Sequence, residues 1–398
     1  MRKPVYSSII LKKGKEEPVL RKHPWIFSGA IAHSEGEVQA GDIVAVLSHD
    51  RKLLGYGLLE EGSIAVKMIS FGTSPIEKDF WQKKFETAFS LRKALGLTNN
   101  SSTTTYRFIN SEGDGMPGLV ADYYNGVMVF QAQSTGMQIL LHTLAESLLS
   151  VYPNHLRAIY SKPAEYTNYS VKNNNLNEGF LWGNAENAVI KENGFQFEVD
   201  FMKGQKTGFF LDQRENREMM RRYAIGRSVL NCFCYTGAFS VYAFGGGAIR
   251  VDSVDSSGTA IENCERNLQL NGFDAFPHSC IKADALKYLD DMKEEYDLII
   301  LDPPAFAKHS HQKANAVRAY RHINRLAIRK AKPGSFLFTF SCSQVIDSSL
   351  FSGIILSAAI EAEREVKLLH HLTQGPDHPV SIFHPEGEYL KGILLYIF

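Results

Sequence analysis

The chain has 398 residues, of which 44% are hydrophobic and 22% are charged, and its formal net charge is zero. This length predicts two or three domains, and the composition is typical of a globular protein rather than a disordered or fibrous one. The zero net charge excludes a uniformly basic nucleic-acid-binding protein, so any such surface has to be a local patch.

Hydrophobic runs and cysteines give two further exclusions. No apolar run approaches the roughly 20 residues that span a bilayer, and the first residues lack the apolar core of a signal peptide. The five cysteines form no C-x-x-C pair, so the sequence indicates neither a disulfide framework nor a metal site. We therefore expect a cytoplasmic protein with reduced thiols, no bound metal and no membrane partner.

Residues 1–72 are predicted to form a small β-barrel. Glycines separate short strand candidates at 8–11, 43–47, 53–58 and 65–69. The first thirty residues hold seven Lys or Arg and two Glu. Such an excess is usually a solvated surface, but Lys22 and Trp25 in R-K-H-P-W place an aromatic ring beside basic groups, which favours RNA binding.

Residues 73–200 are predicted to form a small α+β domain. Helices are expected at 75–95 and 137–149, and strands at 106–109, 119–122, 127–132 and 156–160. A hairpin at 188–199 turns on Asn193 and Gly194. We expect no chemistry in this domain, and the pair Glu112 and Asp114 in E-G-D-G-M-P-G is expected to accept hydrogen bonds from turn N–H groups.

Residues 201–398 alternate strands and helices, which predicts a doubly wound α/β sheet covered on both faces. The expected strands begin at 229 and continue at 248–254, 279–282, 298–301, 336–340, 366–369 and 393–397. The expected helices lie at 215–223, 239–244, 258–271, 285–292, 316–331 and 348–362.

Polar groups follow consecutive strands of this predicted sheet at their carboxyl ends, where doubly wound sheets hold ligands. They are the turn at 231–237 with Gly237, then Asp255, Asp284, Asp302-Pro303-Pro304 and Ser341-Cys342-Ser343. Asp255 comes 18 residues after Gly237, a spacing suited to a ribose-binding acid. Asp252 is a rival for this role, and each acid alone is equally typical of a helix cap.

The sequence of the first turn limits the classes of ligand that this site could bind. C-Y-T-G-A-F has a single glycine and lacks the G-x-G-x-x-G cradle of dinucleotides, and no G-x-x-x-x-G-K-[ST] phosphate loop occurs. A nucleoside-like cofactor without phosphates remains, and S-adenosylmethionine fits. Asp255 would bind its ribose, Asp284 its adenine amino group, and the turn at 231–237 its amino-acid end.

These motifs also carry a resemblance. N-C-F-C-Y-T-G-A-F, V-D-S-V-D-S-S, D-P-P-A-F-A-K and F-S-C-S resemble the class I S-adenosylmethionine-dependent methyltransferases. More narrowly, the chain is similar to bacterial large-subunit (23S) rRNA cytosine-C5 methyltransferases with an N-terminal PUA domain. The likeness spans the chain through L-R-K-H-P-W-I-F-S-G-A-I, E-G-D-G-M-P-G-L, G-Q-K-T-G-F-F-L-D-Q-R, D-H-P-V and E-Y-L-K-G.

The resemblance implies a PUA barrel at 1–72, a small α+β middle domain at 73–200 and a Rossmann-like methyltransferase domain at 201–398. It implies an rRNA substrate, and it leaves a homodimer open. The cofactor contacts that it implies are Asn231, Phe233, Tyr235, Gly237, Asp255, Asp284 and Asp302. The chain departs from the family at Cys232, where an acid is common, so no carboxylate role transfers to that position.

Cytosine C5 is a poor nucleophile, so an enzyme that methylates it first adds a nucleophile to C6. A thiolate suits this step because it both adds and leaves readily. A lone cysteine on a strand is usually inert, but Cys342 stands on the predicted ligand rim, and we interpret it as the nucleophile. Its thiol, with an ordinary pKa of about 8.5, needs a neighbour that lowers that pKa, and the sequence names none. Asp302 is expected to orient the base and help to protonate it, and Asp302 and Glu388 are candidates for the base that removes the C5 proton.

A methyltransferase acting on a base needs a flipped or unpaired nucleotide. Residues 308–332 hold eight Lys or Arg and no acid. At helical spacing, the arginines at 318, 321, 325 and 329 share one face and Tyr320, Ile323, Ala327 and Ala331 the other. A charged face is usually only solvated, but the missing acids favour contacts of RNA phosphates with Lys308, Arg318, Arg321 and Arg325.

Two other functions stay open. Exocyclic-amine methylation of a base also uses an Asp-Pro-Pro motif, but it usually wants an aromatic residue directly after the prolines, where this chain has Ala305. It would also give Cys342 no task. A non-catalytic RNA-binding or ribosome-assembly factor would not need the cofactor rim.

Overall fold

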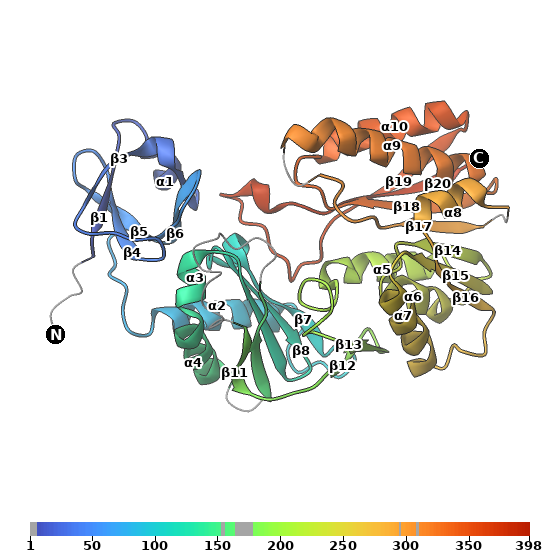
Figure 1. Ribbon diagram of the computed structural model, residues 1–398, viewed down its shortest axis with the longest axis horizontal. Helices are drawn as coiled ribbons and strands as arrows, with labels where there is room; N and C mark the ends of the chain where they lie inside the picture. The colour runs from blue at the N-terminus through green and yellow to red at the C-terminus, as the bar shows by residue number, and fades with distance from the viewer. Residues whose placement is uncertain (1–5, 153–155, 164–177, 294–295, 308–309) are drawn as a thin grey trace. The chain divides into compact units, whose positions relative to one another are not determined.

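The computed structural model describes residues 6–152, 156–163, 178–293, 296–307 and 310–398. The chain divides into two compact units, each built from separate stretches of sequence (Figure 1). The first unit comprises residues 1–188, 199–209 and 376–387, and the second comprises 189–198, 210–375 and 388–398. In the described part of the chain, no helix combines the length and the apolar character that a membrane span requires.

The N-terminal part of the first unit is a six-stranded sheet in the order β2-β6-β5-β4-β1-β3. Its elements are β1 (Ser8–Leu11), α1 (Glu17–Leu20), β2 (Trp25–Phe27), β3 (Ile31–Glu35), β4 (Ile43–Leu47), β5 (Leu53–Leu59) and β6 (Ile64–Phe71). The four predicted strands are confirmed. The strands β2 and β3 were not predicted, because β2 buries only Ile26 and β3 is mostly exposed, so neither shows an apolar alternation.

The rest of the first unit is a five-stranded sheet in the order β11-β10-β9-β8-β7 with helices packed on it. Its elements are α2 (Phe80–Ala94), β7 (Thr105–Asn110), β8 (Leu119–Tyr124), β9 (Val127–Ala132), α3 (Thr135–Ile139), α4 (Leu141–Val151), β10 (Ala158–Ser161) and β11 (Gly179–Gly183). The single helix predicted at 137–149 is two helices that meet at Leu140. Asp114 accepts from the Asn110 N–H, as predicted, and also pairs with the buried Arg92.

The second unit contains a seven-stranded sheet in the order β16-β15-β14-β17-β18-β20-β19. The strands are β14 (Ser228–Cys232), β15 (Arg250–Asp255), β16 (His278–Lys282), β17 (Leu298–Leu301), β18 (Ser335–Ser341), β19 (Val366–Leu372) and β20 (Lys391–Ile397). The first five are parallel, and β20 runs antiparallel between β18 and β19. From β14 the chain moves outward to β15 and β16 and then returns to β17 on the other side. This reversal between β14 and β17 is the place where doubly wound sheets bind ligands.

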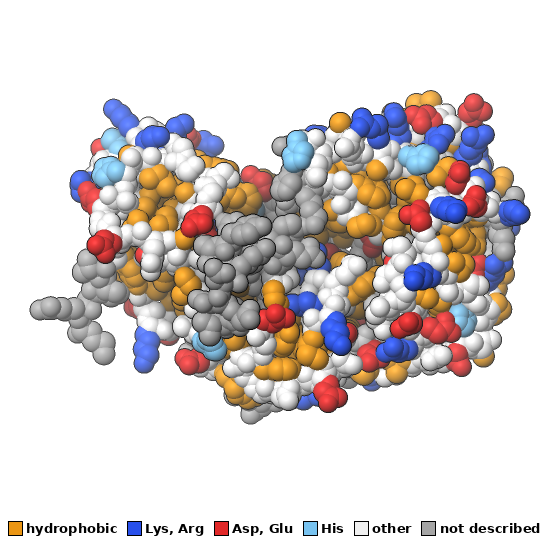
Figure 2. All heavy atoms as spheres, in the orientation of Figure 1, with side chains coloured by type: hydrophobic (Ala, Val, Ile, Leu, Met, Phe, Trp, Pro, Cys, Tyr) orange, Lys and Arg blue, Asp and Glu red, His pale blue; other side chains and the backbone are white. Residues whose placement is uncertain are grey.

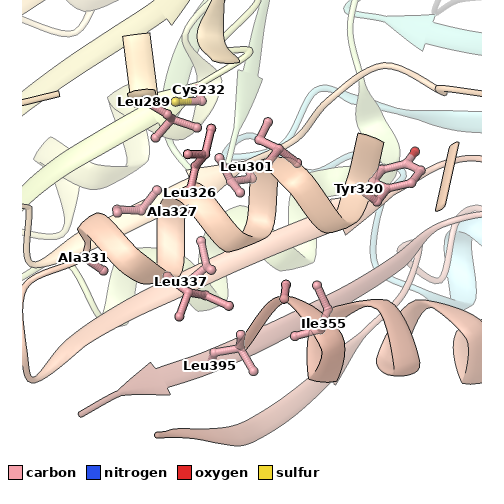
Figure 3. Packing of buried hydrophobic residues seen from close by; sticks show 14 of the residues in the cluster. Cys232, Leu289, Leu301, Tyr320, Leu326, Ala327, Ala331, Leu337, Ile355 and Leu395 are labelled. Atoms are coloured by element: carbon pink, nitrogen blue, oxygen red, sulfur yellow. The ribbon is translucent and has the colours of Figure 1, made fainter. Parts of the chain in front are cut away.

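Helices cover both faces of this sheet, as predicted. They are α5 (Arg214–Arg222), α6 (Ala238–Gly245), α7 (Gly258–Leu270), α8 (Ala285–Asp291), α9 (Lys313–Lys330) and α10 (Ser348–Ala362). The helix α6 packs against α5 and α7, and α9 packs against α8 and α10. Leu326 and Ala327 of α9 pack toward Leu301 of β17 and Leu337 of β18, and Ile355 of α10 closes the same core (Figure 3). The hairpin of β12 (Ala188–Glu192) and β13 (Phe195–Val199) is also confirmed.

Candidate active site

The turn after β14 has an unusual backbone. Phe233, Tyr235 and Gly237 have φ angles of 60°, 47° and 76°, so three alternate residues are left-handed. This conformation is costly for the two aromatic residues, and such strain tends to concentrate at ligand sites. Gly237 is required here, because a Cβ at this position would also lie 2.3 Å from the Cys264 sulfur. The turn therefore holds backbone groups in a fixed form at the start of α6.

Asp255 ties this turn to the end of β15. Its Oδ2 accepts from the Tyr235 N–H at 3.0 Å and its Oδ1 from the Ser257 N–H at 2.9 Å. Asp255 is not the cap of α7, because Ser257 occupies that position and its Oγ accepts from the Ala260 N–H. Each carboxylate oxygen still has a lone pair for a ribose hydroxyl.

The other two acids considered from the sequence differ from Asp255. Asp284 is exposed and caps α8 through the Lys287 N–H at 2.9 Å, so the capping interpretation holds for this residue. Asp252 is fully buried and accepts from the Tyr296 hydroxyl at 2.6 Å, and it pairs with Arg250 at 2.7 Å. Both partners contact Oδ2, and the Asp252 Oδ1 has no hydrogen-bond partner among the described residues. Asp255 is partly exposed at the end of β15 and is therefore the more accessible of the two for a ribose.

Buried polar atoms without a protein hydrogen-bond partner occur in the second unit. Asn231 donates to the Ser240 hydroxyl at 2.9 Å, but its Oδ1 has no partner in the described protein. The same holds for Asp212 Oδ1 and Gln213 Nε2. Buried polar groups are normally satisfied, so such atoms are candidate contacts of a polar ligand. With Asp255 and the strained turn, they fit the polar groups of S-adenosylmethionine.

Asp302 follows β17 and is only partly exposed. Burial raises the pKa of its carboxyl to about 7, the negative charge of Asp212 adds to this rise, and Gln213 and Arg217 oppose it. Asp212 is held by the Tyr389 hydroxyl, which donates to its Oδ2 at 2.6 Å. No role was predicted for Asp212 from the sequence, although it belongs to the specific G-Q-K-T-G-F-F-L-D-Q-R stretch. A carboxyl with this pKa is both donor and acceptor of protons near neutral pH.

Cys342 lies directly after β18 and is partly exposed, whereas Ser341 and Ser343 beside it are fully buried. The Ser343 hydroxyl contacts the Ala307 N–H at 3.4 Å and the Tyr320 hydroxyl at 3.0 Å. Ala307 belongs to the loop that begins at Asp302, so Ser343 joins that loop to the turn of Cys342. Asp302 is also close enough to Cys342 for its charge to act on the thiol.

Burial raises the pKa of the Cys342 thiol to about 12, and the charges of Asp302 and Asp212 contribute to the rise. The Lys391 ammonium acts in the opposite direction. Near neutral pH the side chain is therefore a thiol in the free protein. The other four cysteines also form no disulfide. Burial raises the pKa of Cys232, so this thiol is neutral and does not replace the acid that is common at this position in the family.

The basic helix α9 has the two faces that its spacing predicted. Tyr320, Ile323, Ala327 and Ala331 are buried, and Figure 2 shows Lys and Arg side chains on the part of the surface where α9 lies. Arg318 is exposed. The expectation of an uncompensated charge run was wrong, because Glu361 of α10 lies 3.3 Å from Arg321 and 3.9 Å from Arg325. Lys308 lies outside the described residues.

The two predicted RNA contacts of the N-terminal domain lie in different environments. Lys22 is exposed, and its Nζ lies 5.4 Å from the centre of the Phe383 ring. Trp25 is less accessible than its sequence context indicated. Its Nε1 donates to Glu112 at 2.8 Å, and its ring packs edge-on against His384 with 4.4 Å between the ring centres. A base could therefore use only part of the Trp25 ring.

Family models match two parts of the chain. A PUA-like domain matches residues 9–71, and an S-adenosylmethionine-dependent methyltransferase matches residues 116–385.

Similar proteins match nearly the whole chain. A ribosomal RNA large subunit methyltransferase I from Shewanella denitrificans is 39% identical, with coverage of 97% of this chain and 98% of the relative. The protein of the same name from Vibrio parahaemolyticus is 38% identical with the same coverage. The fold is similar to a solved structure from Streptococcus mutans, described as a candidate S-adenosylmethionine-dependent methyltransferase. Its TM-score is 0.83 at 23% identity, over 98% of this chain and 99% of that one.

Proposed function

Because the chain belongs to the ribosomal RNA large subunit methyltransferase I family of S-adenosylmethionine-dependent methyltransferases, we propose that it methylates carbon 5 of a cytosine in large-subunit rRNA. The observation that carries this proposal is the proximity of Asp302 to Cys342, which shows in the effect of the Asp302 charge on the thiol, with Ser343 joining the Cys342 turn to the loop after Asp302. A nucleophile beside a proton-donating carboxyl is what addition to a pyrimidine ring requires.

The cofactor is S-adenosylmethionine, which supplies an electrophilic methyl group on its sulfonium. The residues that we propose to hold it follow neighbouring strands of the second unit. Phe233, Tyr235 and Gly237 give the strained turn after β14, and Asp255 offers oxygens to the ribose. Asp284 keeps the adenine role proposed from the sequence beside its capping bond.

In the first step the Cys342 thiolate adds to C6 of the cytosine and forms a sulfur–carbon bond. The electrons of the C5–C6 double bond form a C4–C5 double bond, the electrons of the C4–N3 double bond move to N3, and N3 takes a proton from the Asp302 carboxyl. Asp302 is suited to this donation because its pKa of about 7 leaves it partly protonated at neutral pH. The addition gives C5 the electron density that it needs to accept a methyl group.

In the last step a base removes the proton from the methylated C5. The electrons of that C–H bond restore the C5–C6 double bond and expel Cys342 as a thiolate, while N3 gives its proton back to Asp302 where Glu388 is the base, or to water where Asp302 is the base. Asp302 is a carboxylate at this stage and is one candidate for the base. Glu388 is the other candidate. It is exposed, and it is the first residue of the second unit after the segment 376–387 of the first unit.

The direct test is the identity of the product nucleoside. Large-subunit rRNA, both protein-free and as ribosomal particles, is incubated with the protein and S-adenosylmethionine labelled in its methyl group, and then digested to nucleosides. We expect the label to elute with 5-methylcytidine. Label in N4-methylcytidine would contradict the proposal in favour of amine methylation, and cofactor binding without any transfer would favour a non-catalytic RNA-binding factor.

A second prediction concerns the proposed RNA surface on α9. Replacing Arg318 and Arg325 by glutamate is expected to weaken RNA binding and to lower the slope of log affinity against log salt by about 1 for each phosphate that the protein no longer neutralises. Arg318 carries the larger effect, since it has no carboxylate partner in the described structure, whereas Arg325 is near Glu361. Filter binding from low to moderate salt measures this slope.

The matched control is Lys367→Glu, which changes an exposed cation on β19. It should leave both RNA affinity and cofactor affinity unchanged. RNA affinity of the double arginine variant equal to that of the wild type at moderate salt would rule out this surface.

A further inference from the structure

Lys391 is the first residue of β20, and the sheet places it beside the proposed nucleophile. The strand β20 runs antiparallel to β18, and Lys391 pairs with Ser341, the residue before Cys342. Its side chain is buried, with 5% exposure. The Nζ donates to the Ser343 carbonyl at 2.8 Å, so the ammonium lies against the turn that carries Cys342.

The hydrogen-bond partners of this ammonium are neutral. Its second acceptor is the Tyr389 carbonyl at 2.6 Å, and no carboxylate among the described residues is within ion-pair distance of Nζ. A buried cation without a carboxylate is costly, and burial lowers the pKa of Lys391 to about 8. Cys342, Glu388 and Asp347 oppose this shift, and of these Glu388 and Asp347 are exposed side chains.

We propose that Lys391 is the positioning residue that stabilises the Cys342 thiolate by holding an ammonium against the Ser341–Ser343 turn. This inference rests on the proposed C5 chemistry, in which a thiolate is the attacking group. Lys391 acts through Cys342 and does not itself touch the base. Ionisation of the thiol turns an isolated buried cation into a pair of opposite charges, which satisfies both partners.

The charges around Cys342 explain why such a residue is needed. Asp302 from the end of β17 and Asp212 from the segment before α5 both disfavour a thiolate. Lys391 from β20 is the cation that opposes them. Tyr320 of α9, which also faces the thiol, has a raised pKa because of its burial and is neutral near pH 7.

The test measures thiol ionisation without RNA. The protein is treated with iodoacetamide between pH 6 and 10, and mass spectrometry of the peptide containing Cys342 gives the alkylation rate. Lys391→Gln keeps an N–H donor for the carbonyls but removes the charge, and alkylation below pH 8 is expected to fall about tenfold, the effect of one pKa unit. Lys391→Arg keeps the charge and should stay within about threefold of the wild type. Lys367→Gln is the surface control and should match the wild type.

The shape of the pH profile gives an independent readout. The pKa of Lys391 is about 8, so above this pH the wild type loses the ammonium, and its alkylation rate should rise less steeply. An arginine stays charged over this range, and the Lys391→Arg profile should therefore keep rising about tenfold per pH unit. This comparison decides the matter even where Lys391→Gln fails to fold.

Equal alkylation of the wild type and a folded Lys391→Gln variant, or wild-type and Lys391→Arg profiles of the same shape, would overturn the inference. A purely structural role would show as a lower melting temperature of Lys391→Gln with an unchanged Cys342 profile. Failure of the proposed C5 chemistry would be seen in a different experiment, as methyl transfer that continues in a Cys342→Ala variant. That result would not change the alkylation rates of Cys342 measured in the Lys391 variants.

Discussion

Replacing Cys342 by alanine is expected to reduce methyl transfer to cytosine by about 10⁴-fold or more, the loss that follows removal of an essential nucleophile. Without addition to C6, C5 has too little electron density to accept a methyl group. Binding of S-adenosylmethionine and RNA should persist, because Cys342 is partly exposed after the end of β18 and is not one of the buried residues that form the apolar core. Steady-state transfer of labelled methyl groups to rRNA, with cofactor affinity measured by calorimetry, checks both parts.

The matched control is Cys280→Ala. Cys280 is the other partly exposed cysteine, and it lies away from the Asp302 loop, on the edge strand β16. Its variant should retain activity close to that of the wild type. Methyl transfer by Cys342→Ala at a rate near that of Cys280→Ala would remove Cys342 from the mechanism.

Replacing Asp302 by asparagine is expected to have two opposite effects. Methyl transfer should fall about 10²- to 10⁴-fold, the usual contribution of a general acid, because the amide cannot protonate N3. Alkylation of Cys342 should become faster, because the Asp302 charge raises the pKa of the thiol and the asparagine removes that charge. A residue of merely structural importance would not make the proposed nucleophile more reactive as it made the enzyme less active.

The control for the alkylation effect is Asp212→Asn. The Asp212 charge also raises the pKa of Cys342, so this variant should show faster alkylation as well. Alkylation at or below the wild-type rate in both variants would refute this electrostatic coupling.

The pH dependence of methyl transfer follows from the same two groups. The reaction needs Asp302 protonated and Cys342 ionised. Below pH 7 Asp302 stays protonated while the thiolate fraction rises, so kcat/KM should increase about tenfold per pH unit. Between pH 7 and about 8, where Lys391 still holds its ammonium, the loss of the Asp302 proton offsets the gain in thiolate, so the profile should level off.

The sequence predicted most of the second unit because its strands are continuous apolar runs that stop at polar residues. Asp255 and Cys342 both stand where a strand ends. Short or exposed elements were harder to predict. The strand β3 has no buried alternation, and the break between α3 and α4 at Leu140 is marked by neither glycine nor proline.

Asp302 and Cys342 were found from the sequence because each follows its own strand, and the register of β17 and β18 brings their loops together. Asp212 and Lys391 were missed for a topological reason. Lys391 pairs with Ser341 only because β20 is inserted between β18 and β19, and no local pattern encodes that insertion. Asp212 precedes the first strand of the sheet by a whole helix. The charge of α9 was predicted to be uncompensated for the same reason, because the acid near Arg321, Glu361, belongs to another helix.

The most direct test of the covalent mechanism uses RNA that contains 5-fluorocytosine. Fluorine at C5 prevents the final proton removal, so the bond between Cys342 and C6 cannot break. After incubation with S-adenosylmethionine and denaturation, the wild type should migrate as a protein–RNA adduct, and Cys342→Ala should not. The absence of an adduct from either protein, while both still methylate unmodified RNA, would contradict covalent catalysis and leave Cys342 without a chemical role.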